Sequence, residues 1–159
     1  SACPKHFACN SQEKRRNMND SRLSERALRE IYLKGFEICV KESEPKNIMT
    51  SYNRINSVYG HYNYELCTTI LRDEWGYKGN VITDWWMKSE RSPEFPSIRD
   101  QAYRVRAQVD VLMPGGGRSK RRRPDGTLLE SLGKQGGITL GELQRTAINV
   151  LKAVIDIKI

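Results

Sequence analysis

A short apolar run that ends in one carboxylate, followed directly by two indole rings, is the stretch of the sequence best suited to chemistry. Residues 81–86 read Val-Ile-Thr-Asp-Trp-Trp. The carboxylate of Asp84 can attack or stabilise an electron-poor carbon, and the rings of Trp85 and Trp86 offer apolar faces to a sugar ring. The same stretch also fits a simple turn, because Asp after a strand commonly caps or turns the chain. The pattern alone assigns no role to Trp86.

Two other segments carry side chains that suit work beside such a carboxylate. They are residues 5–7, Lys-His-Phe, and residues 49–53, Met-Thr-Ser-Tyr-Asn. A nearby ammonium favours the charged form of a carboxylate, an imidazole can donate from either ring nitrogen, and a phenol can hydrogen-bond the nucleophile. Each residue also has an ordinary alternative: Lys5 as a surface cation, His6 as a core histidine, Met49 as a core residue, and Tyr52 packed with its hydroxyl at the rim.

A strand followed by a helix recurs along the chain, and this order places the motifs at strand ends. Short apolar runs predict strands over residues 2–8, 47–52, 79–84 and 109–113, with polar loops over 9–20 and 53–61. Helices are predicted from Ser21 or Ser24 to Lys41, from the N-cap Asn63 to Gly76, over 98–108 and 127–134, and from Thr139 onward. Ser97 with Asp100, and Thr139 with Glu142, have the spacing of a capping box.

Three of the helices carry apolar residues at steps of three and four, which predicts the face that each one buries. Trp75 is assigned to such a core stripe, whereas nothing in the sequence gives His61 a role. The stripes are Leu28, Ile31, Tyr32, Gly35, Phe36, Cys39 and Val40 in the first helix; Leu66, Cys67, Ile70, Leu71 and Trp75 in the second; and Leu143, Ala147, Val150, Leu151 and Val154 in the last.

Alternating strands and helices favour an α/β fold, because parallel strands need long crossover connections. Four strand–helix units make half of a (β/α)8 barrel, and barrels of this kind build their active sites at the C-terminal ends of the strands. His6, Tyr52 and Asp84 all fall at such ends. A doubly wound open sheet is the alternative, although the sequence contains no G-x-G-x-x-G motif to favour it.

Five segments in series carry a family resemblance. They are residues 5–7, 49–53, 71–79 (Leu-Arg-Asp-Glu-Trp-Gly-Tyr-Lys-Gly), 83–85 and 111–115 (Val-Leu-Met-Pro-Gly). In this order and spacing they resemble glycoside hydrolase family 3, the β-glucosidase family, from about Lys5 to Gly116 and again over 137–143. The resemblance implies a retaining β-glycosidase without cofactor. It implies that Asp84 is the nucleophile and that Lys5 and His6 bind sugar hydroxyls. It also implies that Met49 and Tyr52 line the sugar site and that Trp85 stacks against the adjoining sugar or aglycone.

The resemblance also implies how the chain is organised. Residues 1–116 correspond to strands five to eight of the family barrel, 117–126 to a basic Gly/Pro loop, and 127–159 to terminal helices. The general acid/base and the first half of the barrel are expected elsewhere in a longer parent, and the absence of an initial Met agrees with this. The expected partners are a β-glucoside or related saccharide and those missing parts, or a second copy that closes the barrel as a homodimer. The isolated chain is expected to be inactive or weak; the alternative is a catalytically silent sugar-binding or structural fragment.

The composition argues against several other functions. The chain has 159 residues, 38% of them hydrophobic and 29% charged, which suits one globular domain with a real core. It contains no apolar run of about 18 residues that could span a membrane. The net charge of +8 is partly local, because Arg118, Lys120, Arg121, Arg122 and Arg123 lie within residues 118–123. This run has no interleaved aromatic residues and lies between Gly-rich and Pro-containing segments, so a solvated loop is favoured over a nucleic-acid site.

The cysteines and histidines predict neither a metal site nor a redox motif. Cys3, Cys9, Cys39 and Cys67 lack C-x-x-C spacing, and the two histidines are widely separated. Two of the cysteines fall in apolar helical faces, where a free thiol behaves as a small hydrophobic group. These features favour a reduced, cytoplasmic protein.

Overall fold

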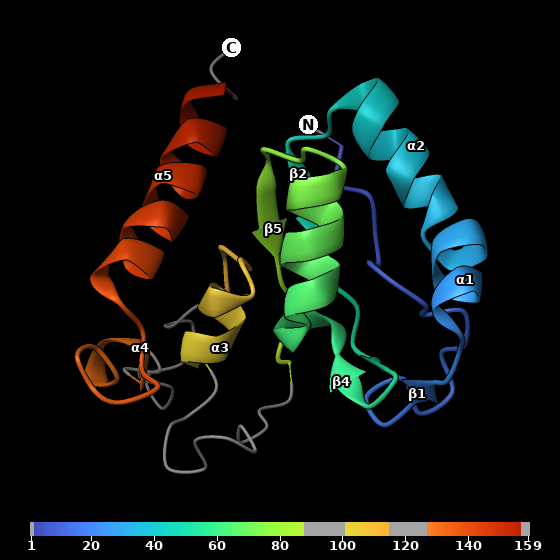
Figure 1. Ribbon diagram of the computed structural model, residues 1–159, viewed down its shortest axis with the longest axis horizontal. Helices are drawn as coiled ribbons and strands as arrows, with labels where there is room; N and C mark the ends of the chain where they lie inside the picture. The colour runs from blue at the N-terminus through green and yellow to red at the C-terminus, as the bar shows by residue number, and fades with distance from the viewer. Residues whose placement is uncertain (1, 88–100, 115–126, 157–159) are drawn as a thin grey trace.

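The computed structural model describes residues 2–87, 101–114 and 127–156, and over these ranges the chain mixes helices with short strands (Figure 1). The elements are β1 (Asp20–Ser21), α1 (Glu25–Ala27), η1 (Leu28–Tyr32), α2 (Lys34–Ser43), β2 (Asn47–Met49), β3 (Arg54–Ile55), β4 (Val58–Tyr59), η2 (Gly60–Tyr62), η3 (Glu65–Glu74), β5 (Asn80–Ile82), α3 (Gln101–Arg106), α4 (Thr127–Glu130) and α5 (Leu140–Asp156). Of these, η1 and η3 are π-helical segments, and η2 is a 3-10 turn.

The predicted strand segments pair side by side, in parallel and in chain order. β2 pairs with β5, and Ile48 lies opposite Val81. Parallel bridges join Phe7 to Thr50 on one side of this pair and Ile82 to Val111 on the other. The expected parallel α/β arrangement is therefore present among the described residues.

Two of the predicted strands are much shorter than expected. Residues 2–8 and 109–113 each contribute a single bridging residue, Phe7 and Val111, instead of a full strand. Both segments lie outside the central β2–β5 pair, and among the described residues each has one strand neighbour. A segment with a strand neighbour on a single side makes about half as many inter-strand hydrogen bonds as a central strand. Its regular strand is therefore shorter.

The first predicted helix is divided by a π-helical turn, which changes the face that it buries. The N–H of Leu33 donates to the carbonyl of Leu28, five residues back, at 2.8 Å. Because a π turn takes up an additional residue, the buried stripe continues from Leu28 to Leu33 and then Val40. Ile31 and Tyr32 were predicted to be buried but are 69% and 42% exposed. The even 3.6-residue spacing assumed from the sequence was wrong at this turn.

The second predicted helix, η3, follows the sequence pattern closely. The side chain of Asn63 accepts a hydrogen bond from the N–H of Leu66 at 3.0 Å, as an N-cap does. Gly76 follows the helix with φ of +72°, a left-handed conformation that favours glycine. The predicted stripe is buried, with Trp75 partly buried at its end. Burial raises the pKa of the Cys67 thiol to about 12, so this cysteine packs as a neutral hydrophobic group.

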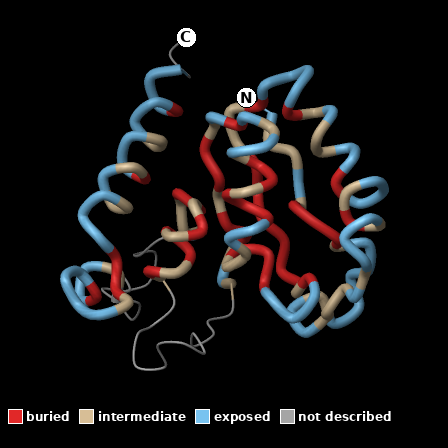
Figure 2. Tube along the Cα trace, in the orientation of Figure 1, coloured by how far each residue is buried: buried red, intermediate tan, exposed pale blue. Residues whose placement is uncertain are grey.

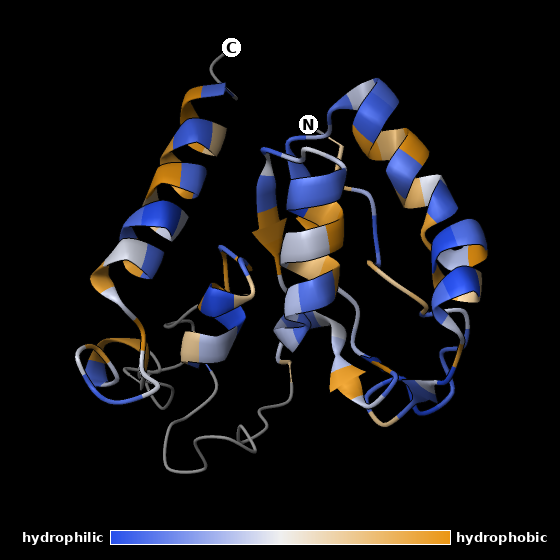
Figure 3. Cartoon of the chain, viewed as in Figure 1, coloured by the Kyte–Doolittle hydropathy of each residue, from blue (hydrophilic) through white to orange (hydrophobic). Residues whose placement is uncertain are grey.

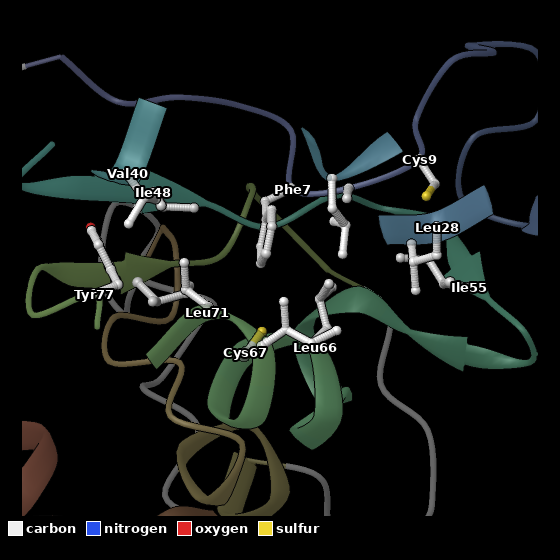
Figure 4. Packing of buried hydrophobic residues seen from close by; sticks show 14 of the residues in the cluster. Phe7, Cys9, Leu28, Val40, Ile48, Ile55, Leu66, Cys67, Leu71 and Tyr77 are labelled. Carbon is white, nitrogen blue, oxygen red and sulfur yellow. The ribbon is translucent and has the colours of Figure 1, made fainter. Parts of the chain in front are cut away.

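The main hydrophobic core lies between η3, the parallel segments and the α1–α2 region, and the buried residues in Figure 2 gather there. The ring of Phe7 lies near its centre and points toward the η3 side chains in Figure 4. It also meets the edge of the Phe36 ring at 5.0 Å and that of Trp75 at 6.1 Å between centroids. The core thus anchors the segment that carries Lys5 and His6.

A small three-stranded sheet occupies segments that were predicted to be loops. β1 pairs in parallel with β3, which forms a hairpin with β4. Asn56 and Ser57 take positive φ values of 48° and 79° at the hairpin turn, the backbone that a two-residue hairpin requires. These strands have two residues each, too few to produce an alternating pattern in the sequence. The prediction of a plain loop over 53–61 was therefore wrong, whereas the loop predicted over 9–20 is found up to residue 19, where β1 begins at Asp20.

The last helix, α5, begins at the predicted capping box. Thr139 N–H donates to Glu142 Oε2 at 2.8 Å, and Glu142 N–H donates to Thr139 Oγ1 at 3.2 Å. The predicted buried stripe is correct only in part: Leu143 packs against the apolar cluster of α3 and Ile138, whereas Leu151 and Val154 are 60% and 61% exposed. The helix also meets the described chain through smaller and polar residues: Thr146 and Ala153 are buried, and Asn149 bonds Asp110. Figure 3 shows apolar residues along much of α5.

The remaining predictions fall partly outside the described residues. α3 covers the later part of the helix expected over 98–108, whereas the Ser97–Asp100 capping box and the basic run at 118–123 lie outside the described ranges. α4 is shorter than the predicted 127–134 helix. No helix among the described residues combines the length and apolar character needed to cross a bilayer.

Candidate active site at the ends of β2 and β5

Asp84 lies two residues beyond the end of β5, and the residue before it is held by the neighbouring segment 111–113. The N–H of Thr83 donates to the carbonyl of Val111 at 2.9 Å, and the Thr83 hydroxyl accepts from the N–H of Met113 at 2.8 Å. Asp84 itself is only 8% exposed. The N–H of Trp85 donates to its Oδ1 at 2.7 Å, which leaves Oδ2 for other partners. The carboxylate is thus buried, oriented and partly available.

His6 is the partner of the second carboxylate oxygen. Its Nε2 lies 3.2 Å from Asp84 Oδ2, and the two side chains are 24% and 12% exposed. The contact is an ion pair when the imidazole is protonated, and a hydrogen bond when a neutral ring carries its proton on Nε2. The following residue, Phe7, donates its N–H to Met49 O at 2.8 Å, which fixes this segment beside β2. The structure therefore unites two residues selected from distant motifs.

Tyr52 also reaches this site, through a main-chain contact at Trp85 and through an interaction of its hydroxyl with the Asp84 carboxylate. Its hydroxyl donates to the main-chain carbonyl of Trp85 at 2.7 Å, so the donor hydrogen is directed at the residue after Asp84. Burial, and then the nearby Asp84 carboxylate, raise the pKa of Tyr52, while Arg16 acts in the opposite direction. The phenol therefore stays protonated and serves as a donor.

The other predicted site residues differ in how closely they approach Asp84. Met49 is 8% exposed and follows the core residue Ile48. Since adjacent strand residues face opposite sides, Met49 points away from that core. Trp85 is half-buried beside Asp84. Lys5 is exposed, and in the described ranges no hydrogen bond or ion pair joins its side chain to Asp84 or His6.

Three polar residues of the segment after Phe7 also belong to this region, although the sequence analysis assigned them to a loop. The guanidinium carbon of Arg16 lies 4.3 Å from the centroid of the Tyr52 ring. Arg16 pairs with Glu13 at 3.0 Å, and the Asn10 side chain donates to the same carboxylate at 2.8 Å. No residue spacing marks these positions. The one available signal was a long polar segment directly after a candidate site motif.

His61, which had no predicted role, belongs to a buried contact between η2 and α3. Its Nδ1 accepts a hydrogen bond from Arg104 Nε at 3.0 Å, and its ring stacks on Tyr59 at 5.3 Å. Burial, and then the Arg104 charge, lower the pKa of His61 well below its usual value. The residue is completely buried, so its role is structural packing between these elements.

The described residues offer no grouping of three His, Cys, Asp or Glu side chains of the kind that holds a metal ion. What the site does offer is one oriented carboxylate, one imidazole, one phenol and an indole. Such a set suits attack on an electron-poor carbon with hydrogen-bond support at the neighbouring groups.

Comparisons with known proteins identify the family of the chain. Residues 1–153 match the family described as "Glycosyl hydrolase family 3 N terminal domain". The chain belongs to glycoside hydrolase family 3. This family match includes the segments that carry His6, Tyr52 and Asp84.

Individual family 3 relatives cover most of the chain. A β-glucosidase from Ruminococcus albus is 43% identical over 148 residues, which is 92% of this chain and 15% of the relative. An exo-α-(1→6)-L-arabinopyranosidase from Bifidobacterium longum is 53% identical over 128 residues, 70% of this chain and 17% of the relative. The chain also superposes on the structure of β-glucosidase 3B from Thermotoga neapolitana in complex with glucose, with a TM-score of 0.82 and 36% sequence identity. The match covers 97% of this chain and 20% of that one.

The chain therefore spans between 15% and 20% of the length of these family 3 members.

Proposed function

We propose that this chain is the nucleophile-bearing segment of a retaining β-glycosidase, with Asp84 as the nucleophile. The observation that carries the proposal is the Asp84 carboxylate, 8% exposed, with one oxygen held by the Trp85 N–H and the other 3.2 Å from His6. A retaining enzyme needs a fixed carboxylate that attacks the anomeric carbon and forms a covalent glycosyl intermediate. The names of the relatives, β-glucosidases among them, support this assignment.

The neighbouring side chains take roles that their contacts support. His6 orients Asp84 and donates to a sugar hydroxyl, while Tyr52 fixes the Trp85 backbone by its 2.7 Å hydrogen bond. Trp85 lies next in sequence to the nucleophile and offers an apolar face to the adjoining sugar or aglycone. Lys5 is exposed next to His6, and its ammonium group donates a hydrogen bond to a sugar hydroxyl. Met49 lines the sugar site. The proposed substrate is a β-glucoside or a related saccharide, since the relatives' names include enzymes for more than one sugar.

The general acid/base is proposed to come from outside this sequence. Glu13 is a second carboxyl group in this region, since it pairs with Arg16, whose guanidinium lies over the Tyr52 ring. Its side chain is 64% exposed. Hydrogen bonds from Asn10 and Arg16 lower the pKa of Glu13, so this group is ionised and is a poor proton donor to a leaving group. General acid catalysis contributes about 10²–10⁴-fold, and we expect the isolated chain to be inactive or weak for lack of it.

We further propose that the parallel segments at Phe7, β2, β5 and Val111 are strands five to eight of a (β/α)8 barrel. Their parallel pairing in chain order supports this. The rest of the parent, or a second copy of the chain, would then pair with the outer sides of the Phe7 and Val111 segments. A crystal structure of the full-length protein checks the proposal: further parallel strands are expected on both sides, and an open sheet edge at both segments would contradict it.

Covalent trapping tests the assignment of the nucleophile. In the full-length protein that carries this sequence, a 2,4-dinitrophenyl 2-deoxy-2-fluoro-β-glucoside should label Asp84 and release dinitrophenolate in equal amount. Peptide mass spectrometry locates the label, Asp84→Asn should abolish it, and the exposed control Asp73→Asn should retain it. A label on a different residue would remove Asp84 as the nucleophile.

The alternative is a catalytically silent sugar-binding or structural segment. It predicts that the full-length protein neither hydrolyses aryl β-glucosides nor becomes labelled, although glucose still binds. Turnover by the full-length protein that is lost in Asp84→Asn would exclude this alternative.

A further inference from the structure

Trp75 lies between two hollows on the surface of the chain. It follows η3 directly and is half-buried, because it packs against the core, where its ring lies 6.1 Å from that of Phe7 between centroids. It also borders one hollow of about 320 Å³ and another of about 490 Å³. Lys41 of α2 lines both hollows as well. The two hollows together are called the Trp75 groove, which lies between α2 and the end of η3.

The Trp75 groove is at the strand ends opposite to the candidate active site. Its lining includes Lys46, directly before β2, and Gly79, directly before β5. In Figure 1, α2 and η3 both end where the loops into β2 and β5 begin, and the β5 arrow points away from that end. At roughly 3.3 Å per residue, the stretch from Gly79 to Asp84 separates the two places by about 16 Å. A single sugar ring therefore cannot contact both.

The charged side chains around the indole are held in place by one another. Glu37 accepts hydrogen bonds from Lys41 at 2.7 Å and from Lys34 at 2.9 Å, and Glu74 accepts one from Arg29 Nη2 at 3.0 Å. These hydrogen bonds lower the pKa of both carboxyl groups, so both are ionised and accept further hydrogen bonds. The groove thus presents oriented donors and acceptors next to an aromatic ring.

The balance of charge in the groove indicates the class of ligand. The larger hollow has three basic and three acidic side chains, namely Arg29, Lys34, Lys41, Glu30, Glu37 and Glu74. The smaller has three basic and two acidic side chains, namely Lys41, Lys46, Lys78, Glu44 and Asp156. An anion or a cation would meet like charges in both hollows. The hydroxyls of a neutral sugar can instead donate to carboxylates and accept from ammonium groups, and an indole offers an apolar face to the ring.

We propose that the Trp75 groove is a second, non-catalytic saccharide site, which binds a neutral oligosaccharide by stacking on Trp75 and by hydrogen bonds to Lys41 and Glu74. This inference goes beyond the proposed function, because the groove binds its ligand without Asp84. A second contact on the same molecule raises the effective concentration of a long saccharide near the enzyme without any change in the catalytic groups. Binding in the groove is therefore independent of turnover of a short substrate.

Fluorine NMR of the full-length protein labelled with 5-fluorotryptophan tests binding at this position. Trp75→Phe, which keeps an aromatic ring against Phe7, identifies the Trp75 resonance by its loss. Cellotetraose, a neutral β-linked glucose oligomer, should shift this resonance in a saturable manner after Asp84 has been trapped with the 2-fluoro glucoside. Calorimetry on the same trapped protein measures the Kd of cellotetraose without any resonance assignment.

Two surface variants and a control connect the binding to the groove. Lys41→Met and Glu74→Gln change side chains that are 49% and 40% exposed, so the fold is retained. Each removes one hydrogen-bonding group and should weaken cellotetraose binding about fivefold. Arg22→Gln removes an exposed arginine that pairs with Asp20 outside both hollows, and it should keep the wild-type Kd. In all three variants, kcat and KM on an aryl β-glucoside should change less than about twofold.

The possible outcomes separate the groove from the proposed function. The absence of a saturable shift at Trp75, or a wild-type Kd in both Lys41→Met and Glu74→Gln, would overturn the saccharide site. A loss of kcat in these variants comparable to their loss of binding would show that the groove belongs to the catalytic site, and would also overturn it. Failure to trap Asp84 would instead contradict the proposed function, and the same titration of the untrapped protein would still decide whether the groove binds.

Discussion

Asp84 and His6 are far apart in the sequence, yet their side chains meet at 3.2 Å. Each is fixed by main-chain contacts of its own segment: Thr83 with Val111 before the carboxylate, and Phe7 with Met49 after the imidazole. The side chains are therefore positioned by strand ends rather than by flexible loop tips. This arrangement suits a site in which a small displacement of a reacting group lowers the reaction rate.

Replacement of His6 should damage catalysis more than stability. His6→Ala removes the group 3.2 Å from Asp84 Oδ2, and the side chain is 24% exposed, so little core packing is lost. We expect kcat/KM of the full-length protein on an aryl β-glucoside to fall about 10²-fold, by analogy with the loss of other charge-stabilising donors. His6→Gln, which retains a donor, should recover part of the activity. An unchanged kcat/KM in His6→Ala would contradict a role in the site.

His61 makes a separate prediction at the residue scale, concerning pH and stability. The pKa of His61 is lowered in the folded protein, so the folded chain holds the neutral imidazole. The stability that this neutral side chain contributes is fully present above the pKa of His61 in the unfolded chain, about 6.5. As the pH falls below that value, the unfolded chain binds a proton that the folded chain does not. The free energy of unfolding should therefore decrease on acidification, by at most about 1.4 kcal/mol per pH unit for one proton.

Urea unfolding of wild type and His61→Gln at pH 7.5, 6.5 and 5.5, followed by tryptophan fluorescence, measures this. His61→Gln should lose less stability than wild type between pH 6.5 and 5.5, while His6→Gln keeps the dependence that is due to His61. Equal slopes in wild type and His61→Gln would contradict the assignment.

At the element scale, a buried ion pair links η3, β5 and α5 at the strand ends opposite to Asp84. Arg72 Nη2 lies 2.6 Å from Asp110 Oδ2, with side chains 8% and 0% exposed. The same carboxylate accepts from Val81 N–H and from the Asn149 side chain, both at 2.9 Å. Arg72 also donates to the Gly79 carbonyl at 3.1 Å. Through Asn149, α5 is thus joined to this buried ion pair.

Arg72→Met should therefore destabilise the protein strongly. It leaves the Asp110 carboxylate buried without its cation, a change that typically costs about 3–5 kcal/mol. Chemical denaturation measures the difference. The control Arg26→Met removes an ion pair whose side chains are 83% and 60% exposed, and it should cost less than about 1 kcal/mol. Similar losses in the two variants would show that the buried pair is not important for folding.

The elements also show where sequence periodicity was informative. Asn63, Gly76 and the Thr139–Glu142 capping box mark helix ends through local contacts, and each is found as predicted. The buried faces are a different matter. The π turn at Leu28–Leu33 shifted one stripe, and α5 buries Thr146 and Ala153 while part of its predicted apolar stripe stays exposed. A helix end depends on adjacent residues, whereas a buried face depends on the surface that the helix meets.

At the scale of the whole molecule, α5 leaves a row of apolar side chains exposed. They are between 49% and 62% exposed and comprise Leu140, Ile148, Leu151, Val154 and Ile155. Contiguous exposed apolar residues favour association in water. The proposed partners, namely the rest of the parent or a second copy, would cover such a row.

The isolated chain should therefore self-associate in a concentration-dependent manner, and Leu151→Gln with Val154→Gln should reduce this association. Light scattering coupled to size exclusion measures the apparent mass. Met18→Gln removes an exposed apolar side chain far from α5 in the sequence, 67% exposed, and should leave the mass unchanged. A monomer at all concentrations in the wild-type chain would contradict the prediction.

The sequence by itself determined the family, the order of strand and helix segments, the helix caps and the motifs around His6, Tyr52 and Asp84, because all of these depend on residue types and short spacings. Tertiary structure alone decided that Tyr52 donates to the Trp85 carbonyl, that Arg16 covers its ring and that Asp110 is buried against Arg72. Such contacts join residues that are distant in the chain, so they depend on the angles and distances at which whole segments pack. No spacing along one segment contains that information.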